Sequence, residues 1–75
     1  MTVNELICLA EKHRSKGDMV RAHKTLLRAR KAIAKIRFKP SRAKAYEYVA
    51  FAQLAFGDLG GARETLAIAR KENPA

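Results

Sequence analysis

The sequence GDMVRAHKTLLRARK at residues 17–31 returns as GDLGGARETLAIARK at residues 57–71. Sliding residues 1–35 onto residues 41–75 gives nine identical pairs, and eight of them fall within these two stretches. Ordinary composition would give about one identity in a stretch of this length. A fixed period of this size is typical of helical repeat proteins. We therefore predict a helical unit that is present twice in the chain.

Each copy opens with the same turn signal, Gly followed by Asp. Gly17 is expected to end the helix before it, because glycine takes the left-handed conformation after a helix at little cost. Asp18 is expected to cap the next helix, because its carboxylate can accept from free amides at the positive end of the helix dipole. Gly57 and Asp58 repeat this turn. At the N-terminus, Thr2 and Glu5 have the spacing of a capping box.

An all-α fold follows from the composition between these turns. Alanine, the best helix former, occurs 14 times, and the alternation expected of strands never persists. Pro40 is expected to stop the second helix, with Lys39 pushed into extended geometry and Ser41 capping the third helix. The four expected helices run from Thr2 to Gly17, from Met19 to Arg37, from Ser41 to Phe56 and from Leu59 to Lys71.

Apolar side chains indicate which faces are buried. The second helix carries one apolar stripe, whereas the third helix, with YEYVAFAQLAF at residues 46–56, is apolar on nearly every side. Such a helix is expected to be central and to pack against neighbours on several faces. Gly60 and Gly61, in the first turn of the fourth helix, indicate either a close backbone neighbour or a frayed helix start. The stripe of the second helix consists of Ala22, Leu26, Ala29, Ile33 and Ile36.

Each half of the chain resembles a tetratricopeptide repeat, an antiparallel helix pair joined by a short turn. The second copy matches the family pattern with Tyr46, Val49, Ala50, Gly57, Asp58, Ala62, Leu66, Ala69 and Pro74. The first copy matches with Leu6, Leu9, Ala10, Gly17, Asp18, Ala22, Leu26 and Ala29. The resemblance implies a single domain over residues 1–75, with repeat one at 2–39 and repeat two at 41–74. The two antiparallel hairpins would stack as a right-handed repeat.

Two features depart from that family. The copies are 40 residues apart, against about 34 in the family, because the second helix carries the extension KAIAKIRFKP. A stable stack generally needs about three repeats, and this chain has two. Self-association into a homo-oligomer such as a homodimer, or docking on a partner, would supply the missing neighbour.

The resemblance also implies a groove, because the first helix of each repeat in that family lines a concave surface that holds an extended peptide. The family's lysine and asparagine set for clamping a carboxylate is not recognisable here. The positions that would line the groove are Asn4, Ile7, Glu11, Arg14, Lys44, Glu47, Phe51 and Leu54.

Positive charge is concentrated in one third of the chain. The net charge is +9, yet residues 19–44 hold ten Lys and Arg and no acid, while the remainder has six basic and seven acidic residues. A solvated face normally mixes both signs, so a run of one sign favours an anionic partner. The residues expected to bind it are Arg21, Lys24, Arg28, Lys31 and Lys35 on one face of the second helix, followed by Arg37, Lys39 and Arg42.

Three kinds of partner fit such a face. An acidic protein surface suits a helical-repeat adaptor and is our first expectation, with nucleic acid as the alternative. An anionic membrane surface is the third, and it is disfavoured because the apolar stripe is needed for the core. A solvated face without a partner is the remaining interpretation.

No catalytic or metal site is predicted. Cys8 and His13 are five residues apart on a helix, so they do not lie on the same face. No Cys and His cluster has zinc spacing, and GDLGG lacks the pattern of a phosphate-binding loop. With one cysteine, no apolar run near 20 residues and no signal-peptide pattern, we expect a cytoplasmic protein. The sequence therefore predicts a non-enzymatic protein-interaction module, a small adaptor or regulator without a cofactor.

Overall fold

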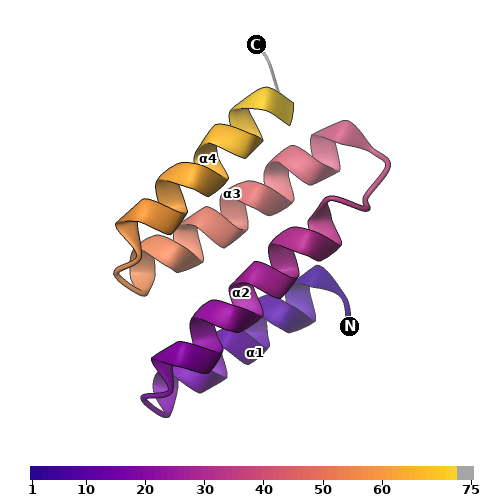
Figure 1. Cartoon of the computed structure of the whole chain (residues 1–75). Coiled ribbons are helices and arrows are strands. Elements are labelled where there is room, and N and C mark those ends of the chain that lie inside the picture. Colours follow the sequence, from indigo (N-terminus) through magenta and orange to yellow (C-terminus); the bar gives the residue numbers. More distant parts are fainter. Residues whose placement is uncertain (73–75) are drawn as a thin grey trace.

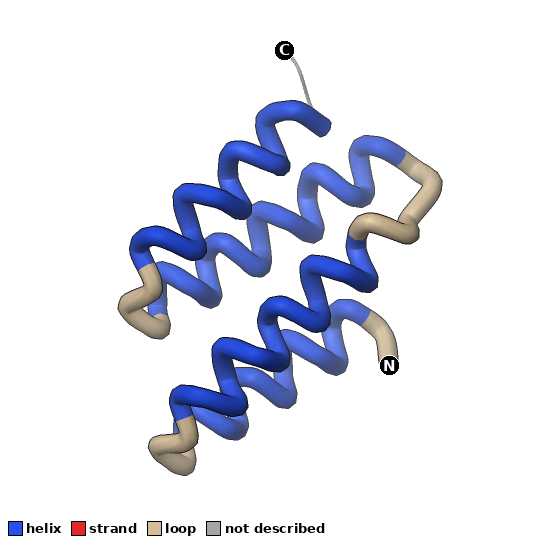
Figure 2. Tube along the Cα trace, in the orientation of Figure 1, coloured by secondary structure: helices blue, strands red, loops and turns tan. Residues whose placement is uncertain are grey.

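Four helices make up most of residues 1–72, the part of the chain that the computed structural model describes (Figures 1 and 2). No strand occurs within these residues, so the expected all-α class is confirmed. The expected ends of the last helix at Asn73 and Pro74 lie outside the described residues. The helices are α1 (Val3–Ser15), α2 (Met19–Ile33), α3 (Lys39–Ala55) and α4 (Leu59–Glu72).

The helices form two antiparallel hairpins that stack side by side. α1 packs closely on α2 and α3 on α4, while α3 also contacts α2 and α1 across the two hairpins. In Figure 1, α2 and α4 lie toward the viewer, and α1 and α3 lie behind them. α3 is therefore the central helix, as the sequence predicts. The Cα trace extends over 38 × 25 × 13 Å, so each helix also reaches the surface.

The two Gly-Asp turns have the same backbone geometry. Gly17 and Gly57 take φ of 80° and 82°, the left-handed conformation that glycine adopts without strain. Asp18 N–H donates to the His13 carbonyl over 2.8 Å, and Asp58 N–H donates to the Gln53 carbonyl over 2.9 Å. This hydrogen bond joins residues five apart in the chain, and one from each glycine N–H joins residues three apart; together they satisfy carbonyls at the end of the helix. The expected role of both glycines is confirmed.

The starts of α1, α2 and α4 are capped as the sequence predicts. Asp18 Oδ1 accepts from the N–H three residues on at 3.1 Å, and Asp58 Oδ1 does so at 2.9 Å. At α1, Thr2 N–H donates to Glu5 Oε1 over 2.9 Å and Glu5 N–H donates to Thr2 Oγ1 over 3.1 Å. The capping box is thus complete, and it satisfies amides that α1 cannot pair internally.

The core lies along the faces where the helices meet. The predicted stripe of α2 is buried from Ala22 to Ile33, and Ile36 is partly buried against it. Alanines at the contacts let the helices approach closely. The buried cluster consists of Leu6, Ala10, Ala22, Leu26, Ala29, Ile33, Tyr46, Val49, Ala52, Phe56 and Ala69.

Helix α3 is less enclosed than its apolar sequence suggests. Tyr48, Phe51 and Leu54 are exposed, so the expectation of burial on several faces is wrong for this side of the helix. The opposite side carries Tyr46 and Val49 into the core. The exposed apolar side chains of α3 leave it with one uncovered face.

Aromatic and polar contacts join the two hairpins. The Phe56 ring meets the His23 ring edge-on at 6.2 Å between centroids, and the Arg14 guanidinium lies 5.4 Å from the same ring centre. His23 Nδ1 also lies 3.7 Å from Asp58 Oδ2. Phe56 and Asp58, at the end of α3 and the turn after it, therefore contact both helices of the first hairpin.

One buried polar pair lies inside the second hairpin. The Thr65 hydroxyl approaches Gln53 Oε1 at 2.7 Å and the Gly61 carbonyl at 3.0 Å. Thr25, the corresponding residue of the first copy, donates its hydroxyl to the Arg21 carbonyl over 2.7 Å. Because buried polar groups are costly without partners, these hydrogen bonds explain why two threonines can lie in the core.

The boundary between α2 and α3 differs from the expected one. α2 ends at Ile33 instead of Arg37, and turn hydrogen bonds from the Lys35 and Ile36 amides close its last turn. α3 begins at Lys39, so Pro40 lies in its first turn, where a missing N–H breaks no helical hydrogen bond. Phe38 takes the extended geometry expected of Lys39, and Ser41 is not the cap.

The two glycines of α4 also differ from expectation. A Cβ on Gly60 would meet nothing within 4 Å, whereas a Cβ on Gly61 would collide with the Asp58 carboxylate and lie 2.9 Å from Gln53 Nε2. Side chains, and not another backbone, therefore crowd Gly61. Nothing in the described residues requires a glycine at residue 60.

Candidate functional site

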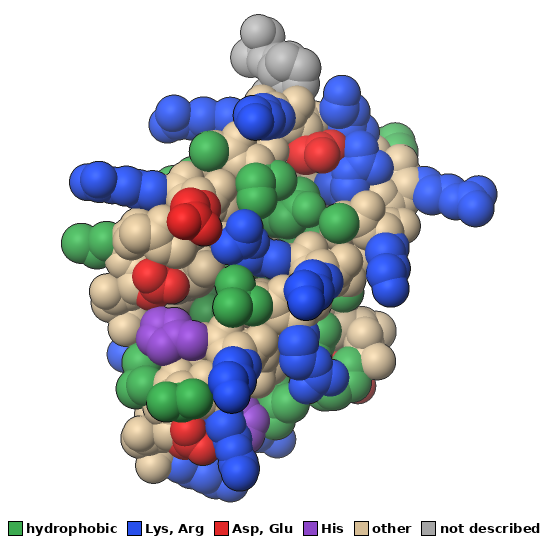
Figure 3. All heavy atoms as spheres, in the orientation of Figure 1, with side chains coloured by type: hydrophobic (Ala, Val, Ile, Leu, Met, Phe, Trp, Pro, Cys, Tyr) green, Lys and Arg blue, Asp and Glu red, His purple; other side chains and the backbone are tan. Residues whose placement is uncertain are grey.

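The largest concentration of unpaired charge lies on α2 and the loop after it. Figure 3, seen from the side of α2 and α4, shows Lys and Arg side chains along α2 and around the α2–α3 loop. Within residues 1–72, none of six exposed basic side chains makes an ion pair with an acidic side chain. We call this set the basic face; it consists of Lys24, Arg28, Lys31, Lys35, Arg37 and Lys39.

The basic face is not a single helical stripe. Lys24, Arg28 and Lys31 lie on α2, but Lys35 and Arg37 lie in the loop because α2 ends before them. Lys39 is the first residue of α3. The expected face of five residues on one helix is therefore shortened, and its continuation is carried by the loop.

Two other basic residues that the sequence assigned to this region have acidic neighbours. Arg21 Nε lies 3.4 Å from Asp18 Oδ2 on the exposed start of α2. Arg30 NH1 lies 3.6 Å from Glu64 Oε2 of α4. The stretch without acids is thus partly neutralised in space by acids from other segments.

Arg42 has a structural role instead of the predicted binding role. Its Nε donates to Glu72 Oε2 over 2.8 Å, and its NH1 donates to the Ile36 carbonyl over 2.6 Å and the Arg37 carbonyl over 3.2 Å. Only 20% of its side chain is exposed. Arg42 therefore fastens the α2–α3 loop to the end of α4, and the prediction that it is free for an anion is wrong.

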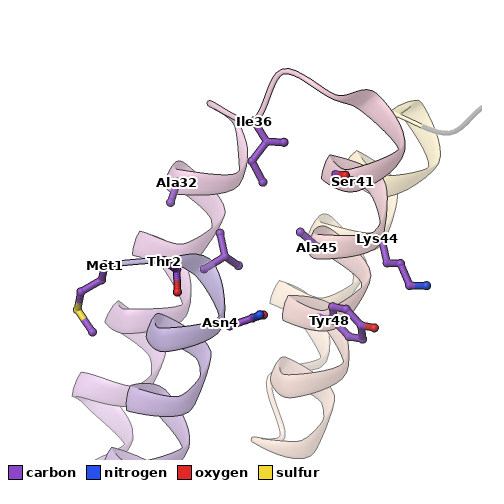
Figure 4. A pocket seen from close by; sticks show the side chains of 10 residues that line it. Met1, Thr2, Asn4, Ala32, Ile36, Ser41, Lys44, Ala45 and Tyr48 are labelled. Carbon is purple, nitrogen blue, oxygen red and sulfur yellow. The ribbon is translucent and has the colours of Figure 1, made fainter.

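A groove lies between α1 and α3, on the side away from the view of Figure 3. Two cavities of about 540 and 530 Å³ adjoin there, because Asn4 of α1 and Tyr48 of α3 line both. In Figure 4, Asn4 points across the first cavity toward Tyr48, and Lys44 points outward from α3. The second cavity adds Ile7, Cys8, Glu11, Phe51, Ala52 and Ala55.

The structure brings together some of the predicted groove residues and separates others. Ile7, Glu11 and Phe51 line the second cavity and Lys44 the first. Arg14 instead covers the Phe56 ring, and Leu54 lines neither cavity. Glu47 lies beside Phe51 in a cavity of about 360 Å³ with Leu66, Ala69 and Arg70, at the open side of the second hairpin.

A cavity on the other side of the molecule was not predicted. This open cavity of about 360 Å³ lies between three helices, with Leu27 from α2, Tyr46 from α3 and Ile68 from α4. Arg30 and Lys31 also line it. One feature of the sequence could have indicated this cavity. Leu27 is a large apolar residue that lies outside the apolar stripe of α2.

Within the described residues, no three His, Cys, Asp or Glu side chains gather as a metal ion would require. The pKa of Glu5 lies below its ordinary value, because the Thr2 N–H and then the Thr2 side chain stabilise its carboxylate. This shift belongs to the helix cap. In residues 1–72, no helix has the length and apolar character needed to cross a membrane.

Comparisons of the chain with protein-family models, with curated proteins and with solved structures gave no match.

Proposed function

We propose that this chain is a non-enzymatic, intracellular protein-interaction module, a small adaptor or regulator that binds an acidic surface of a partner protein. Its basic face makes the contact, and its two hairpins are a degenerate tetratricopeptide-like pair. The matching turns at Gly17 and Gly57 support the repeat interpretation, because the same hydrogen bonds recur at the same positions.

The observation that carries the proposal is the set of charges without acidic partners. Like charges three and four residues apart on a helix destabilise it, so the fold gains nothing from Lys24, Arg28 and Lys31. The second hairpin has Glu64 and Ile68 where the first has Lys24 and Arg28. A hairpin of the same kind therefore forms without this charge, which favours a role in binding.

Nucleic acid is the second candidate partner. Phe38 is 66% exposed between Arg37 and Lys39, and an exposed aromatic ring among cations can stack on a base. One such ring is few for a nucleic-acid surface, and the exposed rings of Tyr48 and Phe51 line the groove between α1 and α3 instead of the basic face. The protein partner is therefore the better-supported choice.

The two candidates separate in a binding experiment. We would titrate the chain with polyglutamate, with single-stranded RNA and with duplex DNA at low and at physiological salt. We expect polyglutamate to bind the unaltered chain at low salt and Arg28→Glu to weaken that binding. Lys12→Glu, which reverses an exposed charge on α1, should weaken it less. Absence of polyglutamate binding to the unaltered chain would refute the proposal, and tighter binding to RNA or DNA would favour the second candidate.

A further inference from the structure

Apolar and basic side chains alternate along the outward side of α2. Val20, Lys24, Leu27 and Lys31 are spaced by four, three and four residues, which places them on one side of a helix. This side is opposite the buried stripe that includes Leu26 and extends over about 17 Å of helix. Val20 is 66% exposed and Leu27 is 48% exposed. We call these four residues the outer ridge of α2.

The outer ridge borders the cavity between α2, α3 and α4. Leu27 forms one wall of that cavity, whose volume of about 360 Å³ is enough to receive a large apolar side chain. Ala34, Tyr46 and Ile68 form the other apolar lining, and Arg30 and Lys31 line it as well. Figure 3 shows hydrophobic side chains between α2 and α4, with cations on the α2 side and acidic side chains on the α4 side.

The second hairpin serves as an internal control for the outer ridge. At the corresponding positions, α4 has Gly60, Glu64, Ala67 and Lys71, so one charge is reversed and both large apolar side chains are missing. α4 nevertheless starts with the same turn and the same aspartate cap as α2. The fold therefore does not require Val20, Lys24 or Leu27, and two exposed apolar side chains on α2 remain without a structural role.

We propose that the outer ridge of α2 binds an acidic amphipathic helix of the partner protein. Apolar side chains of that helix cover Val20 and Leu27, which are about 10 Å apart, and one of them enters the cavity beside Leu27. Carboxylates that flank the apolar side chains pair with Lys24 and Lys31. The inference rests on the proposed function and specifies its partner, because charge alone would need neither of the exposed apolar residues.

A pair of synthetic peptides tests the inference. Both have about 20 residues, enough to form a helix on binding, and the same number of glutamates. One carries leucines at helical spacing, and in the other serine replaces each leucine. We expect the leucine peptide to bind at least about tenfold more tightly, because only its side chains can fill the cavity. Calorimetric titration at low and physiological salt provides the dissociation constants.

Two matched variants locate the binding surface. Leu27→Ala, which copies Ala67 of the second hairpin, is expected to weaken binding of the leucine peptide about tenfold. Leu59→Ala removes another exposed leucine, at the start of α4 and outside the outer ridge, and is expected to change binding less than about twofold. Because both leucines are exposed, both variants should fold, and thermal melting by circular dichroism checks this.

The outcomes separate the inference from the proposed function. Equal binding of both peptides, or no effect of Leu27→Ala, overturns the inference and leaves the acidic partner standing. No binding of either peptide at low salt overturns both. Tighter binding to vesicles with anionic lipids, or to RNA, than to the leucine peptide would also overturn the inference, because the partner would then be of another class.

Discussion

Gly60 and Gly61 are neighbours in one helical turn, yet their surroundings are opposite. Gly60 has open space where a Cβ would lie, while Gly61 faces the Asp58 carboxylate that caps α4 and the amide of buried Gln53. The glycine at residue 61 thus allows the cap and the Gln53–Thr65 pair to lie side by side. Arg21 holds the corresponding position of α2, where Asp18 caps the helix start and His13 stands in place of Gln53.

We predict opposite effects of alanine at these two glycines. Gly60→Ala should raise the free energy of unfolding by roughly 0.5–1 kcal/mol, because alanine loses less backbone entropy in a helix. Gly61→Ala should lower it by about 1–3 kcal/mol, because the Asp58 cap or the buried Gln53 amide must move. Urea unfolding of both variants measures this, and stabilisation by both substitutions would contradict the crowding at residue 61.

Glu5 makes the N-terminal cap depend on pH. Hydrogen bonds with Thr2 lower its pKa in the folded chain. The folded state therefore stabilises the ionised carboxylate more than the unfolded state does. This contribution is present above the ordinary carboxyl pKa of about 4.3 and is lost as the pH falls through the lowered value.

We therefore predict that Glu5→Gln is destabilising at neutral pH and that the difference shrinks in acid. Glutamine can still accept from the Thr2 N–H, so the variant removes mainly the charge at the positive end of α1. Unfolding by urea at pH 7 and at a pH below the ordinary carboxyl range measures the two differences. An equal difference at both pH values would show that the charge of Glu5 contributes nothing.

The loop between α2 and α3 depends on Arg42 more than on its own sequence. One guanidinium binds two carbonyls at the end of the loop and the carboxylate of Glu72, 30 residues away. Hydrogen bonds to a charged group contribute more than neutral ones, and the two partners are only 20% and 24% exposed. The contact holds the start of α3 against the end of α4.

We predict that Arg42→Met lowers the free energy of unfolding by about 1.5–3 kcal/mol, because it leaves partly buried carbonyls and a carboxylate without their donor. Lys39→Met, which removes an exposed cation of the same segment, should change it by less than about 0.5 kcal/mol. Chemical unfolding of both variants, with Glu72→Gln as a third, checks the assignment. Equal effects of Arg42→Met and Lys39→Met would contradict it.

The helices that the sequence placed well are those that begin or end with local signals. Gly17 and Gly57 mark helix ends through their own backbone geometry. Asp18 caps α2 by accepting a hydrogen bond from an amide only three residues away. The end of α2 was misplaced because Ile33 and Ile36 continue its apolar spacing into the loop. No local signal shows that Pro40 starts a helix instead of ending one.

The same distinction explains what could be predicted of the candidate site. Exposed cations such as Lys24 and Arg28 follow from helical spacing alone, and they lie where the spacing puts them. The role of Arg42 could not be predicted, because it depends on Glu72 from a distant helix. The cavity beside Leu27 likewise needs Tyr46 and Ile68, which only the packed hairpins bring together.

The whole molecule carries its charge unevenly. The net charge is +9, and six cations without acidic partners lie on the basic face, while Glu64 and Glu72 of the second hairpin pair with Arg30 and Arg42. Folding places the cations of α2 three and four residues apart on one helix, where neighbouring Cβ atoms are about 5–6 Å apart. In a chain of 75 residues with a small core, this repulsion is a noticeable fraction of the net stability.

We therefore predict that added salt stabilises this protein. Raising sodium chloride from about 0.01 M to 0.3 M shortens the screening length from roughly 30 Å to less than 10 Å. The like-charge pairs of α2 oppose folding by about 1 kcal/mol in total at low salt, so the free energy of unfolding should rise by a similar amount. Thermal melting at both salt concentrations measures the change.

A charge reversal identifies the source of this salt dependence. Lys24→Glu, which copies Glu64 of the second hairpin, places an acid between Arg21, Arg28 and Lys31. The variant should be more stable than the unaltered chain at low salt and should gain less from added salt, because attraction replaces repulsion. Lys12→Glu, on α1, lowers the net charge by the same amount outside the basic face, and it tests whether that alone removes the salt dependence. If both variants lose the salt dependence equally, the net charge of the chain opposes folding and the basic face has no special cost. A binding role would then no longer be needed to explain why these cations are present.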